Sequence, residues 1–245
     1  MTTQHPRTAI VTGSSKGIGA AVAERLARDG LAVVVNYASG AAPAEALVAK
    51  IKAAGGAAIA VKADISKLAD VRALFDAAET AFGGVDVRVN NAGIMKVAPL
   101  AQTTDEVWDQ TIAINLTGTF YALREAAKRL REGGRIVNFS TSVVGLYQPT
   151  YAAYAATKAG IEAITHILSK ELGVRRITVN AIAPGPVNTE LFHNANQHDI
   201  SPIIERTPLH RLGEPDDIAR AISFLVGPDG GWINGQILRA NGGII

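Results

Sequence analysis

The sequence predicts a doubly wound α/β fold: a single domain with a parallel sheet of about seven strands and helices on both faces. Short runs rich in β-branched residues alternate along the chain with helix-length segments. The strand-like runs are apolar throughout, which is typical of strands that are buried on both faces of a parallel sheet. Right-handed crossovers then distribute the helices over the two faces. Because no linker, repeat or change of composition interrupts the 245 residues, we predict one domain over residues 1–245.

Each predicted element follows from local composition and spacing. The strand-like runs are Thr8–Thr12, Leu31–Asn36, Ala57–Lys62, Val85–Val89, Arg135–Ser140, Ile177–Ile182 and Gln236–Arg239. The other segments have the length and apolar spacing of helices. They are Ile18–Arg28, Pro43–Ala54, Lys67–Phe82, Asp105–Arg131, Tyr151–Leu172 and, more roughly bounded, Glu190–Arg206 and Pro215–Val226.

Two of these helices, those beginning at Asp105 and Tyr151, are apolar around most of their circumference. A helix of this kind must be buried on more than the side that faces the sheet. A second copy of the chain would cover the additional side. We therefore expect a homo-oligomer, either a tetramer or a dimer, and the alternative is that long flanking loops cover these helices.

Composition and charge exclude several classes of function. Hydrophobic residues make up 48% of the chain and charged residues 19%, so the chain is not disordered. The absence of cysteine excludes a disulfide framework, a thiolate metal site and a cysteine nucleophile. A net charge of +2 without a dense basic run argues against nucleic acid as a partner. Without a long apolar run or a signal-like start, we expect a cytoplasmic protein with no membrane span.

A glycine-rich turn follows the first predicted strand. Residues Thr12 to Gly19 read T-G-S-S-K-G-I-G and lead directly into the first predicted helix. Glycines permit a tight turn and a close approach to a diphosphate, and the free amides and positive dipole at the start of a helix attract phosphate. In this position the turn predicts a dinucleotide-binding site. The alternative is an ordinary strand-to-helix turn.

Tyr154 and Lys158 lie four residues apart in a predicted helix and share one of its faces. With an ordinary pKa of about 10, a tyrosine is a poor acid or base at neutral pH, but a neighbouring ammonium favours the phenolate and lowers that pKa. Tyr154 is therefore a candidate proton donor to a carbonyl oxygen, or a proton acceptor in the reverse direction. The alternative is two unrelated residues on an amphipathic helix.

Further motifs follow in a fixed order. They are Asn90-Asn91-Ala92-Gly93 after the fourth strand, Tyr154-Ala155-Ala156-Thr157-Lys158 in a helix, and Pro184-Gly185-Pro186-Val187-Asn188-Thr189 after the sixth strand. With them, nearly the whole chain resembles the short-chain dehydrogenase/reductase family, and most of all the branch that includes 3-oxoacyl-carrier-protein reductases. The resemblance implies a Rossmann-type fold and an oxidoreductase that interconverts a ketone and a secondary alcohol. The alternative is a nucleotide-sensing regulatory protein on the same fold, without useful turnover.

The resemblance also implies a catalytic set of Tyr154, Lys158, an asparagine and a serine. Asn115 matches the asparagine that holds a water in the family's proton relay; a role in capping a local helix kink is compatible with this. Ser142 is the expected substrate-binding hydroxyl, because it precedes Val143-Val144-Gly145 as the family serine does. The family's usual spacing to the tyrosine falls on Thr141 instead, and strand alternation places Ser140 on the same side as Ser142.

The cofactor contacts implied by the resemblance come from several segments. They are Gly13, Ser15, Lys16, Gly17, Ile18 and Gly19 in the glycine turn, Asn36 and Ser39 after the second strand, Asp64 and Ile65 flanking adenine, Asn91, Ala92 and Gly93 beside the adenosine ribose, Tyr154 and Lys158, and Pro184, Val187 and Thr189 on the nicotinamide side. For Asp64, an N-cap of the helix near Lys67 is the alternative.

We expect this cofactor to be NADP(H). An NAD-dependent enzyme of this fold needs a carboxylate near the end of the second strand to hold the ribose 2′-hydroxyl. That strand ends in Val34-Val35-Asn36-Tyr37-Ala38-Ser39, without an acid. Lys16 resembles the basic residue that meets the 2′-phosphate in NADP-preferring relatives, and Asn36 and Ser39 add neutral hydrogen-bonding groups. The alternative for Lys16 is a solvated turn residue.

The segment around residues 190–213 is expected to cover the active site. Its polar residues favour a polar or small carbonyl or alcohol substrate over a long acyl chain, and His193, His198 and His210 lack the spacing of a metal site. Two charges depart from the family pattern. Lys96 either meets an acidic substrate group or is solvated, and Arg88 interrupts an apolar strand, where an unpaired charge has little room.

Overall fold

A computed structural model describes residues 6–196 and 199–245, and in it seven parallel strands form one sheet. The strand order is β3-β2-β1-β4-β5-β6-β7, so the chain reverses its direction of progress across the sheet between β1 and β4. The strands are β1 Thr8–Val11, β2 Ala32–Tyr37, β3 Ala58–Lys62, β4 Val85–Asn90, β5 Leu130–Phe139, β6 Thr178–Pro184 and β7 Ile237–Ala240. The predicted doubly wound sheet is confirmed.

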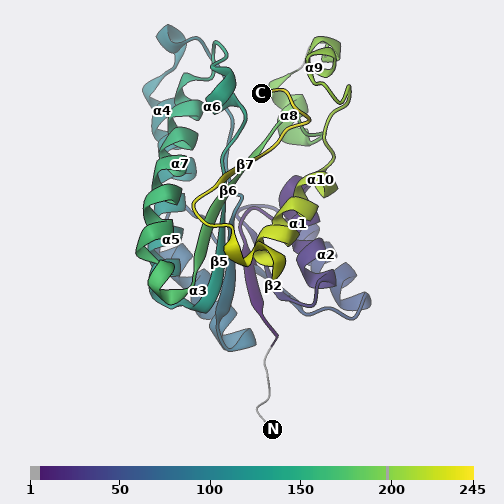
Figure 1. Ribbon diagram of the computed structural model, residues 1–245, viewed down its shortest axis with the longest axis vertical. Coiled ribbons are helices and arrows are strands. Elements are labelled where there is room, and N and C mark those ends of the chain that lie inside the picture. Colours follow the sequence, from purple (N-terminus) through teal and green to yellow (C-terminus); the bar gives the residue numbers. More distant parts are fainter. Residues whose placement is uncertain (1–5, 197–198) are drawn as a thin grey trace.

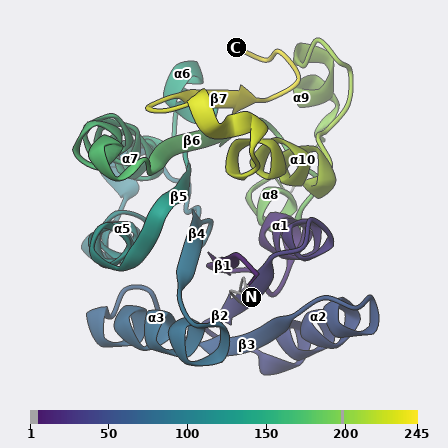
Figure 2. The ribbon, with the colours of Figure 1, turned by 60° about the horizontal axis from the view of Figure 1, so that its bottom comes forward.

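Helices cover both faces of this sheet (Figure 2). One face carries α1 (Gly17–Arg28), α2 (Ala41–Ala53) and α10 (Pro215–Val226). The other carries α3 (Leu68–Phe82), α5 (Gly118–Arg129) and α7 (Ala152–Glu171). Within the described ranges, no helix is long and apolar enough to cross a membrane.

Each face of the sheet has its own hydrophobic core, because successive side chains of a strand point to opposite faces. In β1, Ala9 and Val11 belong to the core under α1, α2 and α10, whereas Ile10 belongs to the core under α3, α5 and α7. All four residues of β1 are fully or almost fully buried. The glycine turn therefore directly follows a buried, central strand of the sheet.

All strands run in one direction, so their carboxyl ends meet at one edge of the sheet (Figure 1, top). The short helices α6 (Val143–Leu146), α8 (Glu190–Ala195) and α9 (Ser201–Arg206) lie at this edge, as does the C-terminus. In an open α/β sheet the crevice forms at this edge, where the strand order reverses. Here that point lies between β1 and β4.

The long helix predicted over Asp105–Arg131 is interrupted. It consists of α4 (Asp105–Thr111), a π-helical segment (Ile112–Thr117) and α5, which ends at Arg129. The π-helical turn contains the buried Asn115, whose amide hydrogen-bonds to the backbone of Ile94. π-Bulges are frequent at functional sites. Sequence periodicity could not reveal this one, because a single wide turn hardly changes the apolar spacing.

Two further boundaries differ from the prediction. Strand β5 begins at Leu130, because its pairing with β4 contains a shift that aligns Val85 with Leu130 and Val87 with Arg135. The helix predicted over Glu190–Arg206 is two short helices, α8 and α9. Pro202 cannot continue a helix from the preceding turn, because it lacks an N–H group and its ring clashes with that turn. Residues 197–198, which include His198, lie outside the described part of the chain.

Arg88 is completely buried in β4. Its Nε donates to Asn90 Oδ1 at 2.7 Å, and its guanidinium carbon lies 5.6 Å from the centroid of the Phe75 ring. Neither Nη atom has a hydrogen-bond partner among the described residues. Burial lowers the pKa of Arg88 to about 9. The sequence could not identify the partners of the Arg88 guanidinium. They are the Asn90 side chain and the face of the Phe75 ring rather than a carboxylate.

We predict that Arg88→Met stabilises the fold. The substitution keeps a flexible apolar stem and removes a buried charge without a counter-ion, which should raise the free energy of unfolding by about 1–3 kcal/mol. Urea denaturation followed by circular dichroism measures the change. Arg28→Met, at an exposed arginine, is the matched control and should change it by less than about 0.5 kcal/mol. A loss of stability in Arg88→Met would contradict this account.

Candidate active site

A pocket opens at the carboxyl edge of the sheet. The end of β5, helices α6 and α7, the segment after β6 and helix α8 surround it, and the segments after β4 and β7 complete its wall. The predicted residues Tyr154, Lys158 and Ser142 line it together with Pro184 and Thr189. Residues that lie far apart in the sequence thus form one site, as the motif order predicted.

Tyr154 and Lys158 lie on one face of α7, and both are buried. Lys158 Nζ donates to the Phe139 carbonyl at 2.8 Å and lies 5.7 Å from the centroid of the Tyr154 ring. Burial raises the pKa of Tyr154 to about 12, an effect that a hydrogen bond with Thr141 partly offsets, and it lowers the pKa of Lys158 to about 8. The expected lowering of the tyrosine pKa by lysine is therefore not found in this conformation. The phenol is protonated at neutral pH, as a proton donor must be.

Asn115 is fully buried in the π-helical segment beside these two residues. Its Oδ1 accepts from Ile94 N at 2.8 Å, and its Nδ2 donates to the Ile94 carbonyl at 2.9 Å. A β-carbon placed on Gly93 would come within 3.1 Å of Asn115 Oδ1 and 3.7 Å of Lys158 Nζ. Asn115 therefore fixes the segment after β4 close to the lysine.

Three hydroxyl residues follow β5, and they point to different partners. Ser140 Oγ donates to Glu162 Oε1 at 2.5 Å, and Ser142 Oγ accepts from Asn241 Nδ2 at 3.1 Å. Both serines are 3% exposed. Thr141 is more exposed than either serine, and its hydroxyl accepts a hydrogen bond from Val143 N at 3.3 Å. All three residues line the pocket, and Ser142 stays the predicted substrate-binding hydroxyl.

The glycine turn is drawn tightly against the segment after β4. Gly13 and Gly17 have φ values of +60° and +58°, where a side chain would be strained. Asn91 Nδ2 donates to the carbonyls of Thr12 and Gly13 at 2.8 and 3.0 Å. A β-carbon on Gly13 would lie 2.9 Å from Ala92 Cα, and one on Gly19 would lie 2.4 Å from the Gly13 carbonyl oxygen. Only glycine fits these two positions.

The start of α1 is open to an anion. No side chain caps it, and its first turn holds no acidic residue. Apart from Thr189 Cγ2 at 3.8 Å, nothing would meet a β-carbon on Gly17 within 4 Å. The exposed amides and the positive end of the helix dipole fit the diphosphate of a dinucleotide. Ser15 and Ile18 lie in the same turn, and Ile18 lines the pocket.

The side chain of Asn36, a predicted cofactor contact, is hydrogen-bonded within the protein. It is 1% exposed, its Oδ1 accepts from Gly13 N at 3.1 Å, and its Nδ2 donates to the Ala63 carbonyl at 3.0 Å. These bonds tie the glycine turn to the ends of β2 and β3, and they direct the amide inward rather than toward a ligand. A buried asparagine needs such partners, but the sequence alone does not show which groups supply them.

A second hollow lies beyond the ends of β2 and β3. Ser39, Asp64, Lys62 and Lys67 line it. Asp64 accepts from Ser66 N and Oγ, and these hydrogen bonds lower the pKa of its carboxyl. Asp64 thus shapes the turn before α3, where Lys67 rather than Asp64 stands at the N-cap position. Ile65 is buried in the core beneath this hollow.

Lys16 is exposed and forms an ion pair across the opening. Its Nζ lies 2.5 Å from Oε2 of Glu190, the first residue of α8. The preceding Thr189 caps α8, accepting a hydrogen bond from Phe192 N. The ion pair therefore joins the glycine turn to the segment that covers the pocket.

Several site residues carried no recognisable signal in the sequence. Asn241 and Ile244 come from the C-terminal segment, and Tyr151 and Phe192 supply aromatic rings to the wall. The tyrosine rings at 151 and 154 meet edge to face, with centroids 6.5 Å apart. An asparagine or isoleucine in isolation predicts no function, so only the folded chain shows that they belong here.

The covering segment presents apolar rather than polar groups to the pocket. Leu191, Phe192 and Ile203 line it, and Asn196 is the only polar residue of this segment to do so among those that the structure describes between Glu190 and Gly213. His193 instead bonds to Asn188. Lys96 does not line the pocket. Across residues 6–196 and 199–245, no group of histidine, aspartate and glutamate side chains could hold a metal ion.

The amino-acid sequence is similar to those of known oxidoreductases. A sequence profile of the family described as Enoyl-(Acyl carrier protein) reductase matches residues 13–245. An uncharacterized oxidoreductase of Methylorubrum extorquens is 45% identical over 241 residues, which cover 97% of each chain.

Solved structures agree with the sequence comparison. A short chain dehydrogenase from Burkholderia cenocepacia, solved with NADP, has 39% identity and a TM-score of 0.93, with 97% of each chain covered. The angucycline C-6 ketoreductase LanV, with bound NADP, has 34% identity and a TM-score of 0.92, covering 97% of this chain and 95% of that one. The chain therefore belongs to the short-chain dehydrogenase/reductase family of oxidoreductases.

Proposed function

We propose that the protein is an NADP(H)-dependent reductase that interconverts a ketone and a secondary alcohol. The observation that carries this proposal is the position of the Tyr154 hydroxyl and the Lys158 ammonium in one pocket, beside an uncapped helix start that suits a diphosphate. When bound, the cofactor supplies the hydride. The chain supplies the phosphate cradle, the proton and the walls that orient the carbonyl group.

Tyr154 provides the proton for the substrate oxygen. As the carbonyl carbon gains a hydride, its oxygen takes the phenolic proton, and the negative charge passes to the Tyr154 oxygen. Lys158, held by the Phe139 carbonyl next to the Tyr154 ring, stabilises this phenolate. In alcohol oxidation the same groups act in the opposite direction.

The walls of the pocket favour an uncharged carbonyl compound with an apolar body. Among the described residues that line it, Lys158 alone carries a charge, and it belongs to the proposed catalytic set. A carboxylate or phosphate on the substrate would lose its hydration without gaining a counter-ion. The apolar part of the wall includes Met95, Val143, Leu146, Leu191, Phe192 and Ile203. This proposal differs from the polar or small substrate that the sequence favours.

The preference for NADP(H) rests on charge. Strand β2 ends at Tyr37 without a carboxylate that would repel a 2′-phosphate, and Lys16 and Ser39 are the residues that we expect to meet this phosphate. Two of the related structures named above contain NADP. Because Lys16 pairs with Glu190, the phosphate must compete with this carboxylate for the lysine.

We also propose that the chain forms a homo-oligomer, a dimer or a tetramer. Trp108, Phe120 and Ile167 are exposed on α4, α5 and α7, the region where the sequence predicts additional covering. A second copy packed there would bury these apolar side chains.

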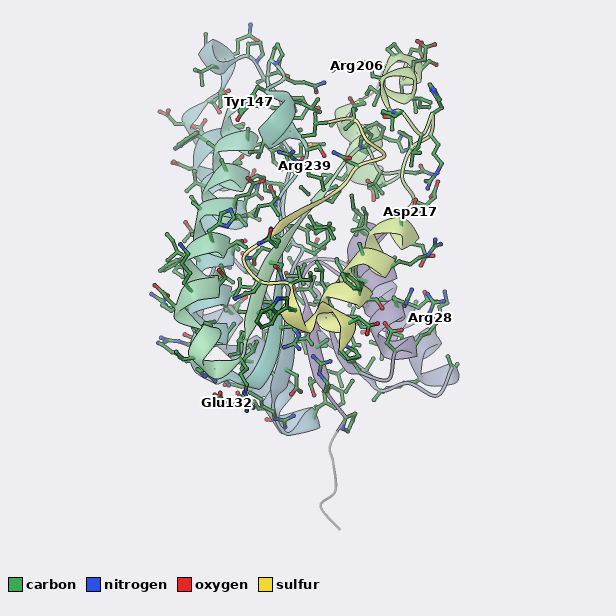
Figure 3. The ribbon with its side chains drawn as sticks, viewed as in Figure 1. Arg28, Glu132, Tyr147, Arg206, Asp217 and Arg239 are labelled. Atoms are coloured by element: carbon green, nitrogen blue, oxygen red, sulfur yellow. The ribbon has the colours of Figure 1, made fainter. Side chains whose placement is uncertain are left out.

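Tyr154→Phe should abolish carbonyl reduction but leave the affinity for NADPH nearly unchanged. The ring keeps its packing against Tyr151, but the proton donor is lost, and such groups contribute on the order of 100- to 10,000-fold. Initial rates with aryl and alkyl ketones, followed by NADPH absorbance, test this. Tyr147→Phe is the control, because Tyr147 is 81% exposed at the end of α6 (Figure 3) and does not line the pocket. A Tyr154→Phe rate within threefold of the wild type would refute the assignment.

Reduction should become slower as the pH rises above about 8. Burial holds the Lys158 pKa at about 8, so the ammonium is present below this pH and is lost above it, while Tyr154, with a pKa of about 12, stays protonated. No carboxylate of the described residues forms an ion pair with Lys158. The pH profile of kcat/KM measures the effect, and Lys158→Arg should remove the decline because a guanidinium stays charged. A wild-type profile that stays level to about pH 10 would contradict it.

Lys16→Ala should weaken NADPH binding by about tenfold or more and leave NADH binding almost unchanged, because a charge-assisted hydrogen bond contributes about 1.5–3 kcal/mol. Glu190→Gln, which frees Lys16, should strengthen NADPH binding by up to about fivefold, as expected for an exposed ion pair. Fluorescence titration of both cofactors measures the four changes. The proposal fails if Lys16→Ala weakens both cofactors equally.

A further inference from the structure

Gln148 and Tyr151 are polar residues of the pocket wall that have no part in the proton transfer. Neither the Gln148 amide nor the Tyr151 hydroxyl forms a hydrogen bond with any described residue. Apart from the Tyr154 hydroxyl, every other described polar side chain of the wall makes a hydrogen bond within the protein, from Asn91 after β4 to Asn196 after α8. Gln148 and Tyr151 are therefore free to bind a ligand.

Tyr151 lies close to the proposed proton donor. It immediately precedes α7, and its ring meets the Tyr154 ring edge to face, with centroids 6.5 Å apart. Burial raises the pKa of the Tyr151 hydroxyl, so the group is protonated at neutral pH and can both donate and accept a hydrogen bond. A ligand oxygen at Tyr154 and a second one at Tyr151 would thus be near neighbours.

Gln148 belongs to the short loop between α6 and α7, whose backbone is strained on both sides of it. Tyr147 has a φ of +49° and Thr150 a φ of +75°, a conformation that β-branched residues rarely adopt. The Thr150 carbonyl accepts a hydrogen bond from Ala98 N at 3.0 Å, which ties this loop to the segment after β4. Strained backbone of this kind is concentrated at sites that hold ligands. The loop therefore presents the Gln148 amide from a fixed position.

The two free groups make an entirely apolar ligand unfavourable. Tyr151 and Gln148 are partly buried, so a ligand that fills the pocket would shield them from water. A polar group that loses water without gaining a partner weakens binding. A ligand that supplies an oxygen for these groups avoids this cost, and a site built in this way rejects analogues that lack the oxygen.

We propose that Tyr151 and Gln148 are specificity-determining residues that bind a second uncharged oxygen of the substrate, a hydroxyl or a carbonyl, a few bonds away from the reacting carbonyl group. This inference rests on the proposed function and narrows its substrate class. The second oxygen is uncharged because, among the described residues of the wall, Lys158 alone carries a charge, and it is held by the Phe139 carbonyl. Tyr151 and Gln148 form and break no covalent bond.

The test uses two pairs of ketones, phenacyl alcohol with propiophenone and β-hydroxypropiophenone with butyrophenone. In each pair a methyl group replaces the hydroxyl group. The wild type should prefer the hydroxylated member of at least one pair by about fivefold or more in kcat/KM, as expected for one or two neutral hydrogen bonds. Tyr151→Phe and Gln148→Met keep the size of the side chains and should each lower this preference, and the double variant should lower it further.

A ratio of two substrates within one protein cancels any general loss of activity. Tyr147→Phe is the matched control: it makes the same chemical change at an exposed tyrosine that does not line the pocket, and it should keep the wild-type ratio. A preference in the double variant that equals that of the wild type would overturn the inference.

A second measurement needs no turnover. Tyr154→Phe protein saturated with NADPH should bind the hydroxylated ketone more tightly than its methyl counterpart in a calorimetric titration. Adding Tyr151→Phe and Gln148→Met should bring the two Kd values within about twofold of each other. A preference in binding without any reduction by the wild type would refute the proposed function alone. Equal Kd values in both pairs for Tyr154→Phe would overturn the inference alone.

Discussion

The close approach between the glycine turn and the segment after β4 is the constraint on which the rest of the site depends. Gly13 and Gly19 leave no room for a side chain against Ala92 and the turn itself. Asn91 donates a hydrogen bond to the Thr12 carbonyl, and Asn36 accepts one from Gly13 N. The two asparagines thus hold the turn from both of its neighbouring strands. Because these contacts hold the turn close to the sheet, α1 begins directly at the edge of the sheet. No side chain caps the backbone N–H groups of its first turn.

The proposed catalytic groups are placed at the same edge, but by different elements. Asn115 binds the backbone of Ile94 and thereby holds the segment that follows the glycine contact. Lys158 is fixed by the Phe139 carbonyl at the end of β5, and Tyr154 lies one helical turn away on α7. Tyr154 and the start of α1, the proposed proton donor and phosphate site, thus occupy fixed positions relative to one sheet.

Sequence predicted those parts that depend on local spacing or composition. Apolar strands and intervening helices gave the doubly wound sheet, and the interval between Tyr154 and Lys158 placed both on one helical face. It could not predict contacts between distant segments. Asn241, the partner of Ser142, lies 99 residues downstream, so the sequence could not show that the Ser142 hydroxyl accepts a hydrogen bond from the C-terminal segment. The inward direction of Asn36 and the wide turn at Asn115 also arise from tertiary packing.

The central claim is that this edge of the sheet performs hydride transfer and does not only bind a nucleotide. Its most direct test uses NADPH deuterated at both C4 positions of the nicotinamide ring, mixed with the wild-type protein and an uncharged aryl ketone. Mass spectrometry of the product should show one deuterium atom on the carbinol carbon, with none acquired there when unlabelled NADPH is used in deuterated water. Tight binding of NADPH without any deuterated alcohol, across a panel of ketones, would contradict the claim and favour a nucleotide sensor.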